Sequence, residues 1–343
     1  MSAPDITREQ WLAMKRSPII TLGASSAAAA CGLGHYESPF ALFHRLRGNV
    51  EPDDLTGNDY VHFGNVLEPI VLSEFARRCS RRLLDPVTDR DLIERLIEQD
   101  GASKVLGWVE GRQAFVASVA RPWQVATLDG VAITEAVERG EFEIVEAKTG
   151  NEYTASAWNG EDEAPDDYRL QAIHQLAVVP SAARNWLAAV IGGNKFRAVE
   201  VQRDPSQIEN LCAVEAAFMA DVAAGIEPVA DGSESSLATL KKLHPDDTGA
   251  TIVLPVEALE IHEELESIKT ELEKLAEPLE ERQKELKNRL RQIIGAATFG
   301  ELPNGAGSYS LKTTEVAPFM NSGSKYRTLR FARPKSKSRK SRS

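Results

Sequence analysis

Three residues whose types suit metal-assisted phosphate chemistry lie in two nearby segments. Asp129 is followed, after sixteen intervening residues, by Glu146, Ala147 and Lys148. In a β-strand, side chains two positions apart point to the same side, so Glu146 and Lys148 project together while Ala147 packs behind them. Two carboxylates are hard oxygen ligands of the kind that Mg²⁺ or Mn²⁺ prefers. We therefore predict that Asp129 and Glu146 bind a divalent cation and that Lys148 acts beside it.

A pair of neighbouring strands would bring these residues to one place. Residues 125–133 and 142–148 both have the composition of strands, and the charged segment 138–141 forms a turn between them. Asp129 then reaches the same point from the adjacent strand. An exposed hairpin without function would carry the same residue types, because Asp-Gly and Glu-x-Lys are common, so neighbouring motifs must decide between the two interpretations.

The first 230 residues have the pattern of one mixed α/β unit. Helical spacing or capping signals predict helices at residues 27–31, 39–47, 66–79, 167–178 and 205–224. Residues 186–191 form an apolar strand, and Glu200 and Val201 lie on an edge strand. The region 85–120 is interpreted as a short helix followed by a strand. The fold class expected from this order is α/β.

The remainder of the chain changes character. Residues 231–255 have the Pro, Gly, Ser and Asp content of a linker, and residues 256–295 form a charged, coiled-coil-like helical stretch with apolar residues at 3–4 spacing. Pro278 should break or kink that stretch, which favours two helices. Residues 296–320 are a small strand-rich segment, and residues 321–343 a basic disordered tail. The role of residues 256–320 stays open.

Composition limits the function classes without selecting one. A hydrophobic content of 42% and a charged content of 27% are typical of a globular protein. The net charge of −11 hides a contrast, since residues 325–343 hold nine Lys or Arg and no acid, and the rest holds 31 basic and 51 acidic residues. An acidic body still binds DNA where a local basic channel makes the contact. DNA binding must therefore be inferred from motifs.

Other chemistries find no support in the sequence. The three cysteines are scattered, which argues against a disulfide framework, a zinc site or an iron–sulfur cluster. No G-x-S-x-G, Walker A, H-E-x-x-H or complete G-x-G-x-x-G motif occurs. His174 is interpreted as a core or helix-face residue.

No run reaches the roughly 18 apolar residues of a membrane span, and the N-terminus lacks signal-peptide features, so we expect a cytoplasmic protein without membrane contact.

Five segments, in order, resemble the YqaJ viral recombinase family of lambda-exonuclease-like enzymes. They are residues 22–28 with Ser38, Pro39 and Leu42 downstream, then 64–68, 126–130, 146–149 and 168–175. Together they extend over about residues 20–180. Region 85–120 does not align, and the spacing from Asp129 to Glu146 is longer than in lambda exonuclease. A further acidic ligand near Glu110 therefore stays open.

The resemblance implies a restriction-endonuclease-like core, with a central mixed sheet flanked by helices, and a Mg²⁺-dependent nuclease in which Mn²⁺ substitutes. Asp129, Glu146 and the carbonyl of Ala147 would hold the metals, and Lys148 would position the attacking water. Two cations about 3.5–4 Å apart would activate the water and stabilise the leaving oxygen.

Further positions of the family pattern have two interpretations each. By resemblance, Glu68 is another metal or water ligand, or otherwise a solvated carboxylate at a helix start. Gln171 hydrogen-bonds the site from a helix face shared with Tyr168 and Gln175, or that face is simply polar. Ser25, with Arg16 as its cation, contacts a DNA phosphate at a helix N-terminus, or Ser25 is an ordinary N-cap.

The expected activity is 5′–3′ exonucleolytic digestion of double-stranded DNA in phage-type recombination. The resemblance also implies a ring-shaped trimer and a single-strand DNA annealing protein as partner. One alternative is a sequence-independent or structure-specific endonuclease on the same fold. Another, from a different class, is a non-catalytic DNA-binding or scaffold protein that uses the helical stretch and the basic tail.

Overall fold

The computed structural model describes residues 2–16, 19–52, 57–134, 141–158, 163–246, 253–303, 306–315 and 325–332. The chain forms two compact units, Met1–Thr248 and Gly249–Ser343. Each unit is described separately below.

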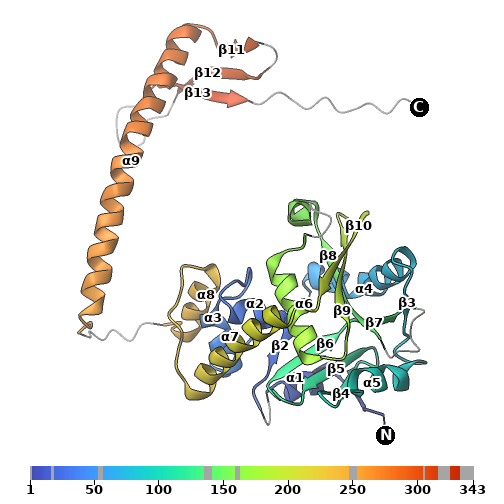
Figure 1. Cartoon of the computed structure of the whole chain (residues 1–343). Helices are drawn as coiled ribbons and strands as arrows, with labels where there is room; N and C mark the ends of the chain where they lie inside the picture. The colour runs from blue at the N-terminus through green and yellow to red at the C-terminus, as the bar shows by residue number, and fades with distance from the viewer. Residues whose placement is uncertain are drawn as a thin grey trace, which may run out of the picture. The chain divides into compact units, whose positions relative to one another are not determined.

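The N-terminal unit contains two five-stranded sheets (Figure 1). The strands of the first are, in spatial order, β1 (Asp5–Ile6), β4 (Ser103–Val109), β5 (Gln113–Ser118), β6 (Gln124–Leu128) and β2 (Leu22–Gly23). Those of the second are β10 (Lys195–Gln202), β9 (Arg184–Ile191), β8 (Glu143–Gly150), β7 (Gly130–Ile133) and β3 (Arg82–Leu83). Both sheets mix parallel and antiparallel pairs, which confirms the α/β class with mixed sheets and the position of β10 at an edge.

Eight α-helices among the described residues surround the sheets. They are α1 (Arg8–Met14), α2 (Ala27–Ala30), α3 (Pro39–Leu46), α4 (Asp59–Arg78), α5 (Arg90–Glu98), α6 (Asp166–Val178), α7 (Pro205–Ala224) and α8 (Glu234–Leu243). Among the described residues, the 3₁₀ helices η1 (Ala24–Ser26) and η3 (Glu152–Trp158) precede α2 and α6. Helix α4 begins earlier than predicted because the side chain of Asn58 accepts hydrogen bonds from the N–H groups of Tyr60 and Val61.

Helices α4 and α6 cover opposite faces of the second sheet (Figure 1). Phe75 of α4 belongs to an apolar cluster with Val145 of β8, whereas Leu176 of α6 belongs to the larger cluster that includes Ile144. Because side chains alternate along β8, its odd positions face α4 and its even positions face α6.

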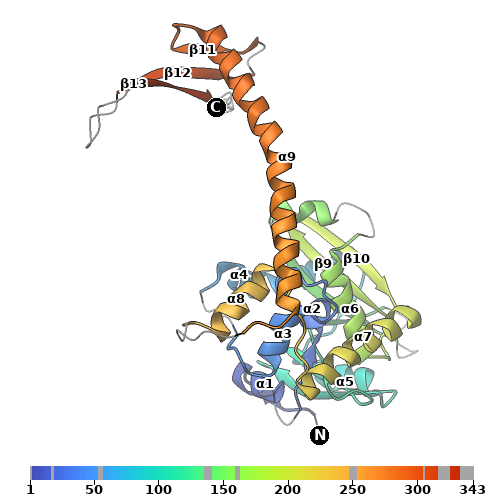
Figure 2. The ribbon, with the colours of Figure 1, turned by 90° about the vertical axis from the view of Figure 1, so that its left-hand side faces the viewer.

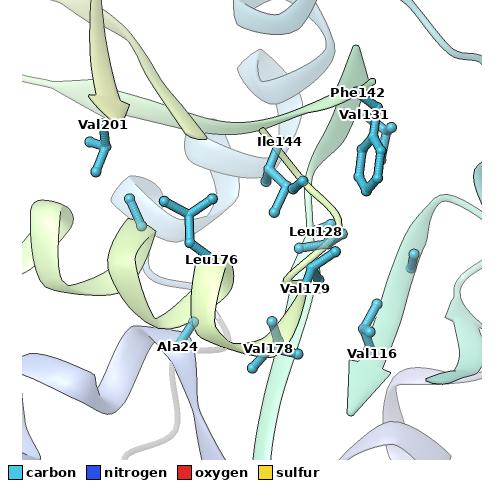
Figure 3. Close-up of a cluster of buried hydrophobic side chains, with 14 of the residues drawn as sticks. Ala24, Val116, Leu128, Val131, Phe142, Ile144, Leu176, Val178, Val179 and Val201 are labelled. Atoms are coloured by element: carbon cyan, nitrogen blue, oxygen red, sulfur yellow. The ribbon is translucent and has the colours of Figure 1, made fainter. Parts of the chain in front are cut away.

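The larger cluster joins both sheets into one core (Figure 3). It takes Val116 and Leu128 from the first sheet, Val131 and Ile144 from the second, and Leu176 from α6. Helix α5 adds three buried residues from the region 85–120, where the predicted helix is followed by two strands, β4 and β5, rather than one. This shared core fixes the two sheets relative to each other.

Two expectations for the N-terminal unit were wrong. Residues 125–133 are not one strand, because β6 ends at Leu128 and β7 starts at Gly130 in the other sheet. Residues 231–255 are not only a linker, since α8 packs on α3 and Ser236 hydrogen-bonds Ser38. The predicted turn at 138–141 falls largely outside the described residues.

The described residues of the C-terminal unit form one long helix and a small sheet (Figures 1 and 2). Helix α9 (Glu257–Ile294) continues through Pro278, contrary to the predicted break. Long runs of helix-favouring Glu, Leu, Lys and Arg on both sides offset the roughly 3 kcal/mol that an interior proline costs. None of the helices in the described part of the chain is long and apolar enough to span a bilayer.

The small sheet has the order β11 (Phe299–Glu301), β12 (Ser308–Glu315) and β13 (Lys325–Ala332). Antiparallel β11 and β12 form a hairpin within the segment that was predicted to be rich in strands. The tail from residue 321 is not wholly disordered, because residues 325–332 pair with β12 along its full length. That segment contains Tyr, Thr, Leu and Phe, which favour strands, and β12 offers it a free edge.

Candidate active site

Asp129 lies where the chain leaves one sheet for the other. Leu128 ends β6 and Gly130 begins β7, so Asp129 is the single residue between them. A Cβ atom at position 130 would lie 3.0 Å from Leu72 Cδ2 and 3.1 Å from Leu83 Cδ1, so glycine allows α4 and β3 to pack closely here. The N–H of Ala147 donates to Asp129 Oδ2 over 3.0 Å, which ties the junction to β8.

Glu146 and Lys148 share the α6 face of β8. Ala147 between them packs with the α4 cluster on the opposite face, as the alternation along the strand predicts. Lys148 Nζ lies 2.8 Å from Glu146 Oε1 and donates to it. Glu146 is only 4% exposed, so its charge is compensated almost entirely by protein groups.

Helix α6 supplies those compensating groups from one face. Gln171 Nε2 donates to Glu146 Oε1 and Gln175 Nε2 donates to Glu146 Oε2, each over 2.6 Å. Gln171 also accepts a hydrogen bond from Lys148 Nζ through its Oε1, over 2.9 Å. The ring of Tyr168, one turn earlier, lies 4.8 Å from the same ammonium. The face predicted from i, i+3 and i+7 spacing therefore meets the Glu146–Lys148 pair directly.

Glu68 approaches Asp129 from α4. Gln113 Nε2, at the start of β5, lies 3.1 and 3.2 Å from the two carboxylate oxygens of Glu68 and 2.8 Å from Asp129 Oδ1. One amide therefore bridges two acids from different elements. Glu68 is accordingly not a freely solvated carboxylate at a helix start, since it lies within the helix and is half-buried.

Burial and neighbouring acids raise the pKa of Asp129 and of Glu68. Burial raises the pKa of Asp129 well above its ordinary value, and Glu146 and Glu68 raise it further against Lys148 and the Ala147 N–H. Burial also raises the pKa of Glu68, with Arg112 opposing and Glu146 adding to the effect. Burial lowers the pKa of Lys148, but Glu146 and Asp129 outweigh it, and the net shift is upward. The site is thus an acid cluster with one internal cation.

The donor set fits a hard divalent cation that keeps part of its water shell. Among the described residues, no three His, Cys, Asp or Glu side chains are arranged so as to enclose a metal ion by themselves. Mg²⁺ does not require such a cage, because it usually binds one or two carboxylates together with waters and substrate phosphates. Asp129 and Glu146 would hold it, and the mutual repulsion that raises the pKa of Asp129 is what a cation would relieve.

A cavity of about 240 Å³ opens onto the acid cluster. Its lining includes Glu68, Gln113, Asp129, Glu146 and Gln171, together with three cations, Arg8, Lys15 and Arg112. Glu110 also lines it, as an exposed residue that pairs with Arg112 over 3.4 Å. Acids that suit a metal and cations that suit phosphate therefore share one cavity.

Ser25 and Arg16 are placed differently from each other. Ser25 is exposed and lines the cavity. It lies inside η1, so it is not an N-cap, and Ser26 occupies the N-cap of the four-residue α2 without a side-chain cap bond. Arg16 is exposed and is not part of the lining, whereas its neighbour Lys15 is.

The ammonium group of Lys15 is packed between the Trp11 ring and Gly23. Its Nζ lies 4.4 Å from the centroid of the Trp11 ring, and a Cβ at Gly23 would be only 2.9 Å from it. Burial, helped by Arg45, lowers the pKa of Lys15 to about 8. Within the described residues Lys15 forms no ion pair with a carboxylate, so an anion in the cavity would stabilise its charge.

Two site residues escaped the sequence analysis. Gln113 lies in the unaligned region 85–120, and only the three-dimensional position of β5 reveals its role. Lys15 is adjacent to Arg16, the predicted phosphate-binding cation, and no periodic signal distinguishes the two residues at the end of α1. Gln175, by contrast, was on the predicted face of α6 and is fully buried beside Glu146.

Comparison with known proteins identifies related chains. Residues 10–183, just over half of the chain, match the YqaJ-like viral recombinase domain. The uncharacterized protein YqaJ of Bacillus subtilis (strain 168) is 27% identical over 310 residues, which are 88% of this chain and 82% of that protein. The resemblance stated from five sequence segments is thereby confirmed.

Solved structures also resemble the chain. The crystal structure of the alkaline exonuclease LHK-Exo from Laribacter hongkongensis has a TM-score of 0.45 at 14% identity, and covers 64% of this chain and 95% of its own. The structure of LHK-Exo in complex with dAMP gives the same TM-score and identity, with 64% and 94% covered.

Proposed function

The chain belongs to the YqaJ-like viral recombinase domain family, and we propose that it is a divalent-metal-dependent DNA nuclease that acts through Asp129, Glu146 and Lys148. The observation that carries this proposal is the meeting of Asp129, at the junction of two sheets, with the Glu146–Lys148 pair on β8. Two acids that line one cavity, a lysine hydrogen-bonded to one of them and further cations in the lining suit hydrolysis of a phosphodiester.

Each protein group has a distinct part in this reaction. A divalent cation, when bound, lowers the pKa of a bound water and offsets negative charge on the phosphate. Asp129 and Glu146 hold that cation, with the carbonyl of Ala147 as a further donor. Lys148 Nζ, already hydrogen-bonded to Glu146 and Gln171, orients the attacking water and offsets the negative charge that builds up on the phosphate.

The surrounding amides preserve this arrangement. Gln171 and Gln175 together donate to both oxygens of Glu146, which fixes the direction of its remaining lone pairs. Gln113 Nε2 orients the carboxylate of Asp129 by donating to its Oδ1, and it also donates to Glu68 Oε1. Glu68 is thus a positioned acid, available for a second cation or for the water.

The cationic part of the cavity favours an exonuclease that starts at a 5′ phosphate. Lys15, Ser25 and Arg8 line the same cavity as Asp129. A terminal phosphate carries more charge than an internal diester and would be drawn to these cations. Lys15 replaces Arg16 in this role because Arg16 is not part of the lining.

Digestion of linear and covalently closed duplex DNA, with Mg²⁺ or with EDTA, tests the proposal. We expect wild-type protein with Mg²⁺ to degrade only the linear DNA and Lys148→Ala to lose at least two orders of magnitude in rate. Cutting of the closed circle would favour the endonuclease. Absence of metal-dependent cleavage of either substrate would overturn the nuclease proposal in favour of a non-catalytic DNA-binding protein.

A further inference from the structure

A second cavity, of about 360 Å³, adjoins the proposed active site and differs from the first in chemistry. Its apolar wall is formed by Leu33, Tyr36, Tyr153, Trp158 and Tyr168. These residues come from three separate places. Leu33 and Tyr36 belong to the segment after α2, Tyr153 and Trp158 to the 3₁₀ helix η3, and Tyr168 to the start of α6. Aromatic rings from distant parts of the sequence therefore converge on one hollow.

The cavity continues directly from the proposed catalytic strand. Thr149 and Gly150 of β8 line it, and they are the two residues after Lys148. Tyr168 is shared, because its ring contacts both Lys148 Nζ at 4.8 Å and Trp158, with the ring centroids 5.9 Å apart. A molecule in this cavity would thus lie beside the group that is proposed to act on the phosphate.

The charges around the cavity select against a phosphate and for an uncharged ring. Among the described residues that line it, Asp166 and Asp167 carry charge and none is Lys or Arg. The first cavity differs because it holds the cations Arg8, Lys15 and Arg112 beside its acids. A phosphate finds cations only in the first cavity, and an uncharged ring finds aromatic partners in the second, so the two cavities suit the two chemically different parts of a nucleotide.

Two of the rings are exposed in a way that suits stacking. Tyr153 is 94% exposed and Tyr36 is 78% exposed. Large aromatic side chains usually bury most of their surface, and their faces attract other π-systems in offset or edge-on geometries. Nucleobases are planar π-systems that stack on aromatic residues with little dependence on their identity.

We propose that this aromatic cavity binds an unstacked nucleobase of the DNA strand whose phosphate lies at Asp129, Glu146 and Lys148. The proposal rests on the proposed nuclease function, which it deepens by naming what holds the nucleotide next to the scissile bond. Turnover then requires one base to leave the duplex stack. Duplexes with a frayed or mismatched end, where that step costs less, are the better substrates.

The first experiment uses linear duplexes that carry an abasic nucleotide at one of the terminal positions, one position at a time. Wild-type full-length protein with Mg²⁺ should show an increase in KM of roughly tenfold for one abasic position. Tyr153→Ala should raise KM by a similar factor on intact DNA and add nothing on that abasic substrate. Tyr153→Phe, which keeps the ring, should restore the wild-type KM, and Phe299→Ala, which removes an exposed ring of the C-terminal unit, should have no effect.

Equal losses for Tyr153→Ala on intact and abasic DNA, or no loss on either, would overturn the stacking proposal while hydrolysis itself still occurs. A second readout does not depend on hydrolysis. In EDTA, 2-aminopurine at the sensitive position should be quenched on binding to wild type and to Tyr153→Phe but not to Tyr153→Ala. If wild type bound DNA without any Mg²⁺-dependent cleavage, the nuclease function would fail, and the 2-aminopurine signal would still decide whether a base stacks here.

Discussion

Gln113 Nε2 donates a hydrogen bond to Asp129 Oδ1 over 2.8 Å, from a strand that the chain reaches sixteen residues earlier. The same amide lies within hydrogen-bonding distance of both oxygens of Glu68. It is a donor placed between two acids that would otherwise repel each other, and it sets where each carboxylate points before a cation arrives.

Replacing that amide should weaken use of the metal. We expect Gln113→Ala to raise the Mg²⁺ concentration for half-maximal hydrolysis by roughly 10- to 100-fold, since partners of metal-binding carboxylates have effects of this size. Gln99→Ala, a glutamine at the end of α5, is the matched control. A Mg²⁺ titration of hydrolysis measures the effect, and a Gln113→Ala curve that superimposes on wild type would show that the bridge has no role.

Asp129 should destabilise the metal-free protein at neutral pH. Its folded-state pKa is raised above the unfolded value, so the folded state prefers the protonated carboxyl. The resulting stability is fully present below the unfolded pKa and is lost as pH rises through the folded one. In EDTA at pH 7, Asp129→Asn should therefore increase the free energy of unfolding by about 0.5–2 kcal/mol while abolishing hydrolysis.

Thermal unfolding in EDTA between pH 4 and pH 8 measures this effect. The difference between Asp129→Asn and wild type should grow with pH, and saturating Mg²⁺ should reduce it by stabilising only the wild type. A less stable Asp129→Asn protein across the whole range would contradict the charge-repulsion account.

Lys15 should give phosphate recognition a distinctive pH dependence. Because burial lowers the pKa of Lys15 to about 8, its charge is lost at a pH where an ordinary lysine is still protonated. A preference for 5′-phosphorylated over 5′-hydroxyl duplex ends should therefore decline as pH rises above about 8. Lys15→Arg should keep the preference to higher pH, and Lys15→Ala should remove it at all pH values.

Initial rates on the two kinds of end, measured from pH 7 to pH 9.5, supply the test. Arg16→Ala is the matched control, because Arg16 is the adjacent cation and does not line the cavity. If Arg16→Ala lost the preference and Lys15→Ala kept it, the original choice of Arg16 from the sequence would be the better one.

A buried pair beneath the site should contribute to stability and not to metal binding. His174 Nε2 donates to the carbonyl of Val125, and its Nδ1 lies 2.7 Å from Glu215 Oε1. Gln124 Nε2 donates to the other oxygen of Glu215 over 2.7 Å, and both His174 and Glu215 are fully buried. One proton must lie between the imidazole and the carboxylate, so the pair acts as a hydrogen-bonded unit.

Glu215→Ala leaves His174 and Gln124 without that partner and should cost about 3–5 kcal/mol, or roughly 10 °C in Tm. Glu209→Ala, on the exposed side of α7, should change Tm by about 1–2 °C at most. Calorimetry of the two variants provides the comparison. Equal Tm values for the two variants would mean that the buried pair has no net effect on stability.

The part of the site that follows from local periodicity could be predicted from the sequence. Alternation along a strand places Glu146 and Lys148 on one side, and helical spacing places Gln171 and Gln175 on one face of α6. Both patterns depend on backbone geometry that neighbouring residues set by themselves. The α/β class and the helical character of the C-terminal extension are confirmed for the same reason.

Features that depend on tertiary packing could not be predicted. At the break beside Asp129, Leu72 and Leu83 pack closely on Gly130, and these residues come from α4 and β3. Gln113 reaches Asp129 only because β5 pairs with β6 in the first sheet. The continuity of α9 through Pro278 and the pairing of residues 325–332 with β12 likewise depend on the balance between competing local and distant contacts.

Isothermal titration of wild-type protein and of Asp129→Asn with Mg²⁺ and Mn²⁺ tests whether Asp129 binds the cation. We expect wild type to bind either cation and Asp129→Asn to lose this binding. Glu74→Gln, which alters a glutamate of α4 that does not line the cavity, should retain it. Binding of Mg²⁺ and Mn²⁺ by Asp129→Asn with wild-type affinity would contradict the assignment of Asp129 and Glu146 as the metal site.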